Sequence, residues 1–166
     1  WAKIYDAELA DLLKAQADYS QKILNIERAG GLQPRKDISR WSEVKEEISY
    51  FFDHNFNLNP EELNSIKEEL GNIDTDAFIN EFLSTYDIND DPETWFEKLK
   101  NIGEKYGFAK SVKDYKEAPE KYKGQVGSLA KLLRFRLTGR LRTPNLCLIM
   151  QVMGEEMIKK RLLKTF

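Results

Sequence analysis

The sequence has little of what extracellular and membrane-spanning proteins are built from. Its 166 residues include a single cysteine, Cys147, so no disulfide can form within the chain, and this fits a reducing cytoplasm. No apolar run approaches the roughly 18 residues that a membrane span needs, and no charged-then-apolar leader opens the chain. The first residue is Trp1 rather than methionine, so we interpret the chain as a piece of a longer protein. We expect a cytoplasmic protein without a membrane partner.

Residues that carry out catalysis or hold metals are also scarce. The only histidine, His54, follows the aromatic run Tyr50-Phe51-Phe52 and has no second ligand at metal-binding spacing, so we interpret it as a surface or packing residue. Acidic pairs such as Glu46-Glu47 lie between apolar positions, where a solvated helix face is the simplest interpretation. Cys147 lies in an apolar run and is expected to be a buried, inert thiol. The sequence predicts no catalytic residue and no metal site.

Strand signals are missing as well, because β-branched residues do not alternate with polar ones. Apolar residues instead recur at spacings of three and four, which predicts amphipathic helices. The clearest series are Trp41-Val44-Ile48-Phe51-Phe52, Phe78-Ile79-Phe82-Leu83-Tyr86 and Trp95-Phe96-Leu99-Ile102-Tyr106. We predict an all-α protein of about nine or ten helices.

Helix ends are marked by capping residues. A capping side chain stands directly before a proline, the order typical of a first helical turn, in Asn59-Pro60, Asp91-Pro92 and Thr143-Pro144. A glycine follows a periodic run, where a left-handed residue closes a helix, at Gly71, Gly107 and Gly139. These signals leave short joints between the helices, which favours a compact helical assembly.

Charge is distributed unevenly along the chain. Residues 1–90 contain 9 basic and 19 acidic residues, which gives a net charge of −10. Residues 91–166 contain 17 basic and 9 acidic residues, which gives a net charge of +8. The acidic, turn-rich segment 87–92 coincides with the change of sign. We therefore place a boundary there, with a first, acidic helical subdomain at residues 1–91 and a second, basic one at residues 92–166.

The basic half contains the strongest functional signal. Between Lys121 and Gly154 there are seven Lys or Arg residues and no acid, which favours a polyanionic partner such as a nucleic acid. A solvated helix face is the alternative. Four apolar residues are spaced for one buried stripe of a helix over residues 126–138: Val126, Leu129, Leu133 and Leu137. Lys131 and Arg134 share another face of that helix.

A second helix is predicted to start close to Arg134. Gly139 ends the first helix, and Arg140 and Arg142 form a basic loop before a helix capped by Thr143 and opened by Pro144. The backbone N–H groups of Asn145 and Leu146 would then point outward at the positive end of a helix dipole, where phosphate or base acceptors bind well. We predict one binding site from these parts. An ordinary helix-turn-helix corner with surface arginines is the alternative.

Four motifs near the C-terminus resemble the final segment of one enzyme family. They are Leu132-Leu133-Arg134, Leu137-Thr138-Gly139-Arg140, Thr143-Pro144-x-Leu146 and Ile149-Met150-Gln151-Val152-x-Gly154-Glu155-Glu156. The family is that of the bacterial glutamyl-tRNA synthetases, in which this segment belongs to the helical anticodon-binding region. Further motifs, among them Trp95-Phe96-Glu97-Lys98 and Pro34-Arg35-Lys36-Asp37, resemble the same region, so the resemblance covers nearly the full chain.

The resemblance implies a part of a class I aminoacyl-tRNA synthetase. The fold it implies is all-α, with two consecutive helical subdomains that form an anticodon-binding helical cage. The implied partner is the anticodon stem-loop of tRNA(Glu). In the family, an arginine at the position of Arg134 and the residues at Thr143, Pro144 and Leu146 contact the anticodon, and all four positions match. Lys131, Arg140 and Arg142 complete the predicted site as neighbouring cations.

The resemblance also implies a parent enzyme, a monomeric ligase that joins glutamate to tRNA(Glu) with ATP and Mg. The catalytic domain precedes this region in the family, and its two ATP-binding signatures are absent from these 166 residues. The chain is therefore expected to recognise tRNA without a catalytic site or a cofactor of its own, and to bind no DNA.

The chain departs from the family pattern at three places. Arg136 stands where relatives usually carry small or apolar residues, Cys147-Leu148 replaces an aromatic-acidic pair, and Gln125 stands where histidine is frequent. These departures bear on the fine contacts of the segment. The alternative to RNA recognition is a non-enzymatic helical adaptor that docks on an acidic protein through its basic C-terminal face.

Overall fold

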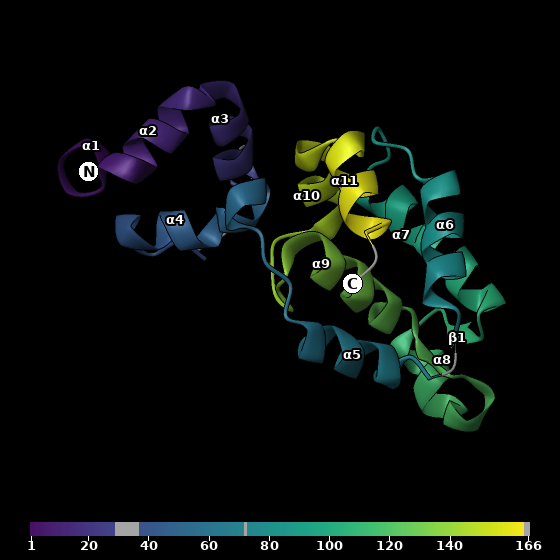
Figure 1. Ribbon diagram of the computed structural model, residues 1–166. Helices are drawn as coiled ribbons and strands as arrows, with labels where there is room; N and C mark the ends of the chain where they lie inside the picture. Colours follow the sequence, from purple (N-terminus) through teal and green to yellow (C-terminus); the bar gives the residue numbers. More distant parts are fainter. Residues whose placement is uncertain (29–36, 72, 165–166) are drawn as a thin grey trace. The chain divides into compact units, whose positions relative to one another are not determined.

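The computed structural model describes residues 1–28, 37–71 and 73–164, so the motif Pro34-Arg35-Lys36-Asp37 lies largely outside it. Within the described residues there are eleven α-helices, four 3-10 helices and two strands of two residues each (Figure 1). The prediction of an all-α fold is confirmed. The chain folds as two compact units, Trp1–Phe56 and Asn57–Phe166.

The first unit is built from short helices. In order they are α1 (Ala2–Tyr5), α2 (Ala7–Ala15), α3 (Ala17–Asn25), η1 (Trp41–Glu43), α4 (Val44–Glu47), η2 (Ser49–Phe51) and η3 (Asp53–Asn55). Tyr19 on α3 meets the rings of Phe51 and Phe52 edge-on, with ring centroids 6.2 and 6.0 Å apart. This aromatic cluster fixes α3 against the segment that follows α4.

The single helix expected over residues 41–52 is broken in the structure. Tyr50, Phe51 and Phe52 are consecutive and all three are buried. Consecutive residues of an α-helix point about 100° apart, so three in a row cannot all face one core. The backbone instead passes through the 3-10 turn η2 into an extended Phe52, which lets the three rings enter the same core. Trp41, expected on the apolar face, is 68% exposed.

The second unit is larger. Its elements are α5 (Pro60–Glu69), α6 (Thr75–Thr85), α7 (Pro92–Lys105), β1 (Phe108–Ala109), α8 (Val112–Glu117), η4 (Pro119–Lys121), β2 (Gly124–Gln125), α9 (Val126–Thr138), α10 (Leu146–Met153) and α11 (Glu155–Leu162). Helix α9 is central, because it packs against α5, α7 and α11, and Figure 1 shows it between α5 and the α10–α11 pair. The stripe predicted along this helix is confirmed, since its four apolar residues are all buried.

Most predicted helix ends agree with the structure. The Asn59 side chain accepts hydrogen bonds from the N–H groups of Glu61 and Glu62, and Pro60 is the first residue of α5. Asp91 caps α7 in the same way, directly before Pro92. Gly139 closes α9 with a left-handed φ of +68°, a conformation that side chains with a Cβ rarely adopt.

The expectation of no strands is wrong for four residues. Strands β1 and β2 pair in parallel, with Phe108 opposite Gly124 and Ala109 opposite Gln125. Two residues are too few to produce an alternating pattern in the sequence, so no sequence signal could mark them. A Cβ on Gly124 would lie 3.2 Å from the Phe108 ring, so glycine allows this close pairing.

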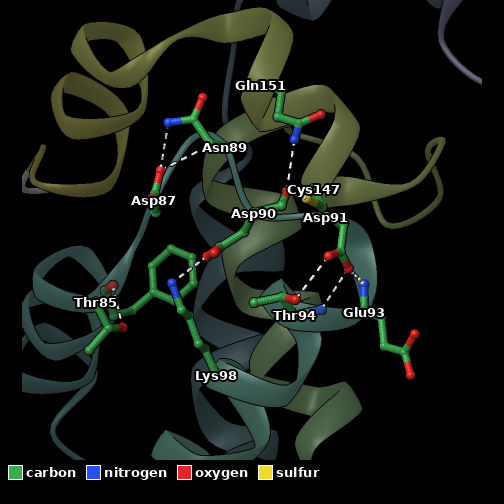
Figure 2. Close-up of polar contacts among 11 residues, drawn as sticks. Thr85, Asp87, Asn89, Asp90, Asp91, Glu93, Thr94, Lys98, Cys147 and Gln151 are labelled. Carbon is green, nitrogen blue, oxygen red and sulfur yellow. Dashed lines mark hydrogen bonds and ion pairs between the residues drawn. The ribbon is translucent and has the colours of Figure 1, made fainter.

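The acidic turn at residues 87–92 lies inside the second unit rather than at the boundary between units. Figure 2 shows how it is fastened: the Asp90 carboxylate pairs with Lys98 of α7 at 2.5 Å, and the Gln151 amide of α10 donates to the Asp90 carbonyl at 2.8 Å. The Phe82 ring of α6 meets the Trp95 ring of α7 edge-on at 6.0 Å. The two compact units of the structure meet at residues 56/57. The boundary predicted from the change of charge lies at residues 91/92.

Limited proteolysis of the native chain is expected to cut at residues 56–59 earlier than at residues 87–92. The former segment joins two compact units, whereas the latter is tied to α7 and α10 through Asp90. Mass spectrometry of the earliest fragments checks the order of the two cuts. As a matched control, Gln151→Leu removes one of the ties and should raise the rate of cutting at 87–92 alone. A native chain cut first at 87–92 would contradict the assignment of this turn to the second unit.

Candidate nucleic-acid interface

A groove with a volume of about 470 Å³ lies in the second unit, between α7, α9 and the start of α10. Helix α7 contributes one face with Pro92, Glu93, Trp95, Phe96, Glu97 and Lys100. The other side consists of Ala130 and Arg134 of α9, with Asn145 and Leu146 at the start of α10. The groove therefore combines aromatic, acidic and basic side chains from three helices.

Arg134 reaches the groove because of its position on α9. The apolar stripe of this helix faces the core, and Arg134 follows Ala130 by one helical turn, so both residues line the same side of the groove. Arg134 is partly buried, so its guanidinium has less conformational freedom than that of a fully exposed arginine. Ala130 is small and leaves space next to it. The structure thus brings Arg134 and Leu146 together, as the sequence predicted.

The start of α10 differs from the prediction. Thr143 is not the cap and Pro144 is not in the first turn, because α10 begins at Leu146 and Asn145 is its N-cap. The Asn145 side chain accepts a hydrogen bond from the Leu148 N–H at 3.3 Å, whereas the Thr143 hydroxyl donates to the carbonyl of Pro144 at 3.0 Å. Since asparagine caps helices at least as well as threonine, the second capping residue displaced the helix start by two positions.

This displacement changes which backbone N–H groups lack an acceptor within the helix. These groups belong to the cap and the first three residues of a helix, and here they are those of Asn145, Leu146, Cys147 and Leu148. Asn145 takes up the N–H of Leu148. The predicted pair of donors, Asn145 and Leu146, remains among the N–H groups without an acceptor in the helix, and Cys147 joins them.

The remaining predicted cations lie outside the lining of the groove. Lys131 forms an ion pair with Glu69 of α5 at 2.7 Å, so its charge is compensated within the protein. Arg140 is partly buried, and its backbone N–H donates to the Thr138 hydroxyl at 3.1 Å. Arg142 is exposed in the loop that enters α10. Both arginines lie in the loop between α9 and α10.

Comparison with known proteins identifies the family. The family model described as "Anticodon binding domain" matches residues 7–166. The chain belongs to the anticodon-binding domain family. This confirms the family that the C-terminal motifs indicated, and nothing in the comparisons supports the adaptor alternative.

Curated relatives agree with this assignment of the domain. The chain is 38% identical over 162 residues to the glutamate–tRNA ligase of Clostridium perfringens strain 13, which covers 98% of the chain and 30% of the relative. It is 38% identical to the glutamate–tRNA ligase of Acetivibrio thermocellus, covering 98% of the chain and 29% of the relative. For that of Sorangium cellulosum the identity is 33% and the coverages are 98% and 28%. The chain thus spans about 30% of the length of these relatives, and no solved structure matches it significantly.

The α7 wall of the anticodon-binding domain was missed as part of the site. The sequence placed Trp95 and Phe96 in a core pattern, but Phe96 is only partly buried and lines the groove. Its ring lies nearly parallel to that of Trp95, at 19° and 6.4 Å. The ammonium of Lys100 is 5.1 Å from the Phe96 centroid and 2.6 Å from Glu97. The available signal was the pair of charged and aromatic residues spaced four apart, which puts Phe96 and Lys100 on one face.

Two arginines of the domain are buried rather than presented to RNA. Arg136 and Arg161 are each 2% exposed. Arg136 donates to the Lys164 carbonyl, and Arg161 to the Leu137 carbonyl, both at 2.6 Å. Burial lowers the pKa of the Arg136 guanidinium from its usual value, and Asp76 at 3.6 Å opposes this effect. The departure at Arg136 therefore concerns the packing of the C-terminal segment and not the nucleic-acid surface.

The residues outside the groove behave mostly as expected. Cys147 is buried with its sulfur 3.5 Å from the Asp90 carbonyl, and burial raises the pKa of its thiol to about 11, which keeps it protonated near neutral pH. His54 is exposed beside the Phe52 ring. In the part of the chain that the structure describes, no helix has the length and apolar character of a membrane span.

Proposed function

We propose that this domain recognises the anticodon of tRNA(Glu), as the anticodon-binding part of a glutamate–tRNA ligase. The observation that carries the proposal is the meeting of Arg134, the start of α10 and the aromatic wall of α7 in one groove of a domain from the anticodon-binding family. The curated relatives, which are named glutamate–tRNA ligases, support the choice of tRNA.

The chemistry of single-stranded RNA loops fits this groove. Sequence-specific RNA recognition uses bases that leave the stack, rest on aromatic rings and form hydrogen bonds along their edges. The guanidinium of Arg134 offers paired donors to a base edge, and Leu146 offers an apolar contact together with a backbone donor. Thr143 and Pro144 hold the loop that enters α10 in place. Lys131 contributes less, because Glu69 already compensates its charge.

Arg140 and Arg142 supply the part of binding that does not depend on sequence. Both lie in the loop between α9 and α10, where they would contact phosphates on either side of the bound bases. Such contacts release counterions and make the affinity depend on salt. They orient the RNA, while Arg134 and the groove select the bases.

In the parent enzyme we place the activation of glutamate by ATP with Mg in a separate catalytic domain. The present chain contributes tRNA recognition and no catalytic residue or cofactor. We expect the parent enzyme in the cytoplasm as a monomer that binds tRNA and not DNA.

We expect the chain to bind an RNA hairpin with the anticodon stem-loop of tRNA(Glu) at least about tenfold more tightly than a hairpin with the same stem and a scrambled loop. The reason is that each wrong base costs on the order of 1–3 kcal/mol of binding free energy in nucleic-acid recognition. Fluorescence anisotropy of labelled hairpins measures both affinities. If Arg140 and Arg142 each contact one phosphate, log Kd should rise with log salt with a slope of about 1.4.

The double variant Arg140→Ala/Arg142→Ala should abolish most of this slope and preserve the preference for the anticodon loop. Lys113→Ala/Lys116→Ala on α8 is the matched control, since it removes two exposed charges far along the sequence from the groove. Equal affinity of the wild-type chain for the two hairpins would contradict the proposed function. An adaptor for an acidic protein would show that result.

A further inference from the structure

The position of α10 is set by two neighbouring helices. Helix α10 packs against α7 and α11, and each of these packs against α9, which carries Arg134. The groove lies between α7, α9 and the start of α10, so its width depends on how α10 is placed relative to α7. The contacts that join these two helices therefore affect the shape of the binding site.

Two side chains of α10 converge on one backbone atom of the turn before α7. The Gln151 amide nitrogen donates to the Asp90 carbonyl oxygen at 2.8 Å, and the Cys147 sulfur lies 3.5 Å from the same oxygen (Figure 2). Cys147 and Gln151 are four residues apart, so they share one face of the helix. A thiol is a weak donor and an amide N–H a strong one. Gln151 therefore provides most of this link between α10 and the turn.

The turn that receives the link is fastened at several points. The backbone N–H and the side-chain amide of Asn89 both donate to the Asp87 carboxylate, at 2.9 and 3.0 Å. The Asp90 side chain is 10% exposed and pairs with Lys98 of α7 at 2.5 Å. The Asp91 side chain caps the first turn of α7. The Asp90 carbonyl is therefore fixed relative to α7, and a hydrogen bond from α10 to this carbonyl joins the two helices.

The link lies close to the groove along both helices. Asp90 stands two residues before Pro92, which lines the groove at the start of α7. Gln151 follows Leu146, which lines the groove at the start of α10, by five residues, or about 7.5 Å along the helix axis. Loss of the link would therefore let the start of α10 move relative to the α7 wall.

We propose that Gln151 is a positioning residue for RNA recognition, because its hydrogen bond to the Asp90 carbonyl holds the start of α10 at the distance from α7 that the anticodon loop requires. The inference rests on the proposed function and adds a residue outside the groove lining. A site held in its binding geometry beforehand loses less conformational entropy when the matching ligand binds. A scrambled loop does not match this geometry, so the link raises selectivity and not the general affinity for RNA.

The experiment compares whole chains by fluorescence anisotropy with the anticodon hairpin and the scrambled hairpin. Gln151→Leu keeps much of the side-chain volume and removes the donor. It should raise Kd for the anticodon hairpin about fivefold and leave Kd for the scrambled hairpin within about twofold of wild type. The preference for the anticodon hairpin then falls severalfold. Gln151→His restores an N–H donor of similar reach and should recover most of the lost preference.

Lys98→Met tests the other half of the link, since it removes the tie between the Asp90 carboxylate and α7. Gln151→Leu and Lys98→Met break one series of contacts. The double variant should therefore lose about as much preference as Gln151→Leu alone, whereas the losses at independent sites would multiply. Gln21→Leu, the same change at an exposed residue of α3, is the matched control and should alter neither affinity.

Circular dichroism checks that each variant is folded. A folded Gln151→Leu chain that keeps the full preference overturns the positioning role and leaves the proposed function standing. Equal losses for the two hairpins also overturn it, because Gln151 would then support the fold and not the recognition geometry. If Gln151→Leu does not fold, full preference in Lys98→Met overturns the role. A wild-type chain that does not distinguish the two hairpins overturns the proposed function itself, and the inference with it.

Discussion

Replacing Arg134 with alanine is expected to weaken binding of the tRNA(Glu) anticodon stem-loop by about 1–3 kcal/mol, roughly one to two powers of ten in Kd. The Arg134 side chain is partly buried and lines the groove together with Leu146 and Asn145. The loss should be largest for the cognate loop and smaller for a loop that lacks the base contacted by Arg134. Affinities of wild type and variant for the two hairpins test this expectation.

Three further variants distinguish the contribution of positive charge from that of the paired hydrogen-bond donors of Arg134. Arg134→Lys keeps the charge but loses the planar pair of donors, so we expect most of the loss to remain. Lys159→Ala, whose side chain pairs with Glu155 on the exposed face of α11, should give at most a weak loss that is the same for both hairpins and depends on salt. Pro144→Gly loosens the loop before α10 and should weaken binding without removing charge. If the Arg134→Ala chain binds both hairpins as tightly as wild type, the prediction that Arg134 contacts the anticodon loop is wrong.

Replacing Arg161 with alanine is expected to lower the free energy of unfolding by about 2–4 kcal/mol. The Arg161 side chain is 2% exposed, and its guanidinium donates to the Leu137 carbonyl at 2.6 Å. Leu137 lies in the last turn of α9, where the helix cannot satisfy its own carbonyl groups. The substitution removes a charged donor from a buried acceptor and leaves a cavity. Urea unfolding followed by circular dichroism and tryptophan fluorescence measures the loss.

The neighbouring Lys160 provides the control, because it is exposed on the same helix and its replacement by alanine should change the free energy of unfolding by no more than about 0.5 kcal/mol. Arg161→Met should lose less than Arg161→Ala, since methionine refills most of the volume but donates no hydrogen bond. Equal stability of Arg161→Ala and wild type would show that the buried hydrogen bond to α9 does not hold α11 in place. RNA affinity of the folded variant should stay near that of wild type, because Arg161 lies outside the groove.

Local signals in the sequence predicted local structure well. The caps at Asn59 and Asp91, the left-handed Gly139 and the buried stripe of α9 all depend on residues within one or two helical turns of one another. The interactions that decide them are therefore present in any short window of the chain. The start of α10 was wrong by two residues because two capping residues, Thr143 and Asn145, compete there and only the folded loop decides between them.

Charge and compactness divide the chain at different places, near residue 91 and at residues 56/57. The change from acidic to basic residues near residue 91 reflects what each helix presents to solvent and not which helices share a core. Residues 78, 79 and 82 of α6 are buried in the second unit. The turn that joins α6 to α7 is held by Asp90, whose contacts with Lys98 and Gln151 span 8 and 61 residues. The contact with Gln151, over 61 residues, carries no signal in a sequence window.

The sequence by itself determined the helical class, the family and the two residues, Arg134 and Leu146, that meet in the groove, because these depend on motifs and on spacing within single helices. Only the tertiary structure decided which charges remain available to a ligand. Lys131 is paired with Glu69, 62 residues away, and Arg136 and Arg161 are buried, whereas Phe96 and Glu93 of α7 come to face Arg134. The burial of a side chain and its pairing with another charge depend on which helices pack together. The residue type alone does not reveal whether a charged side chain lies in the core, in an ion pair or in a binding groove.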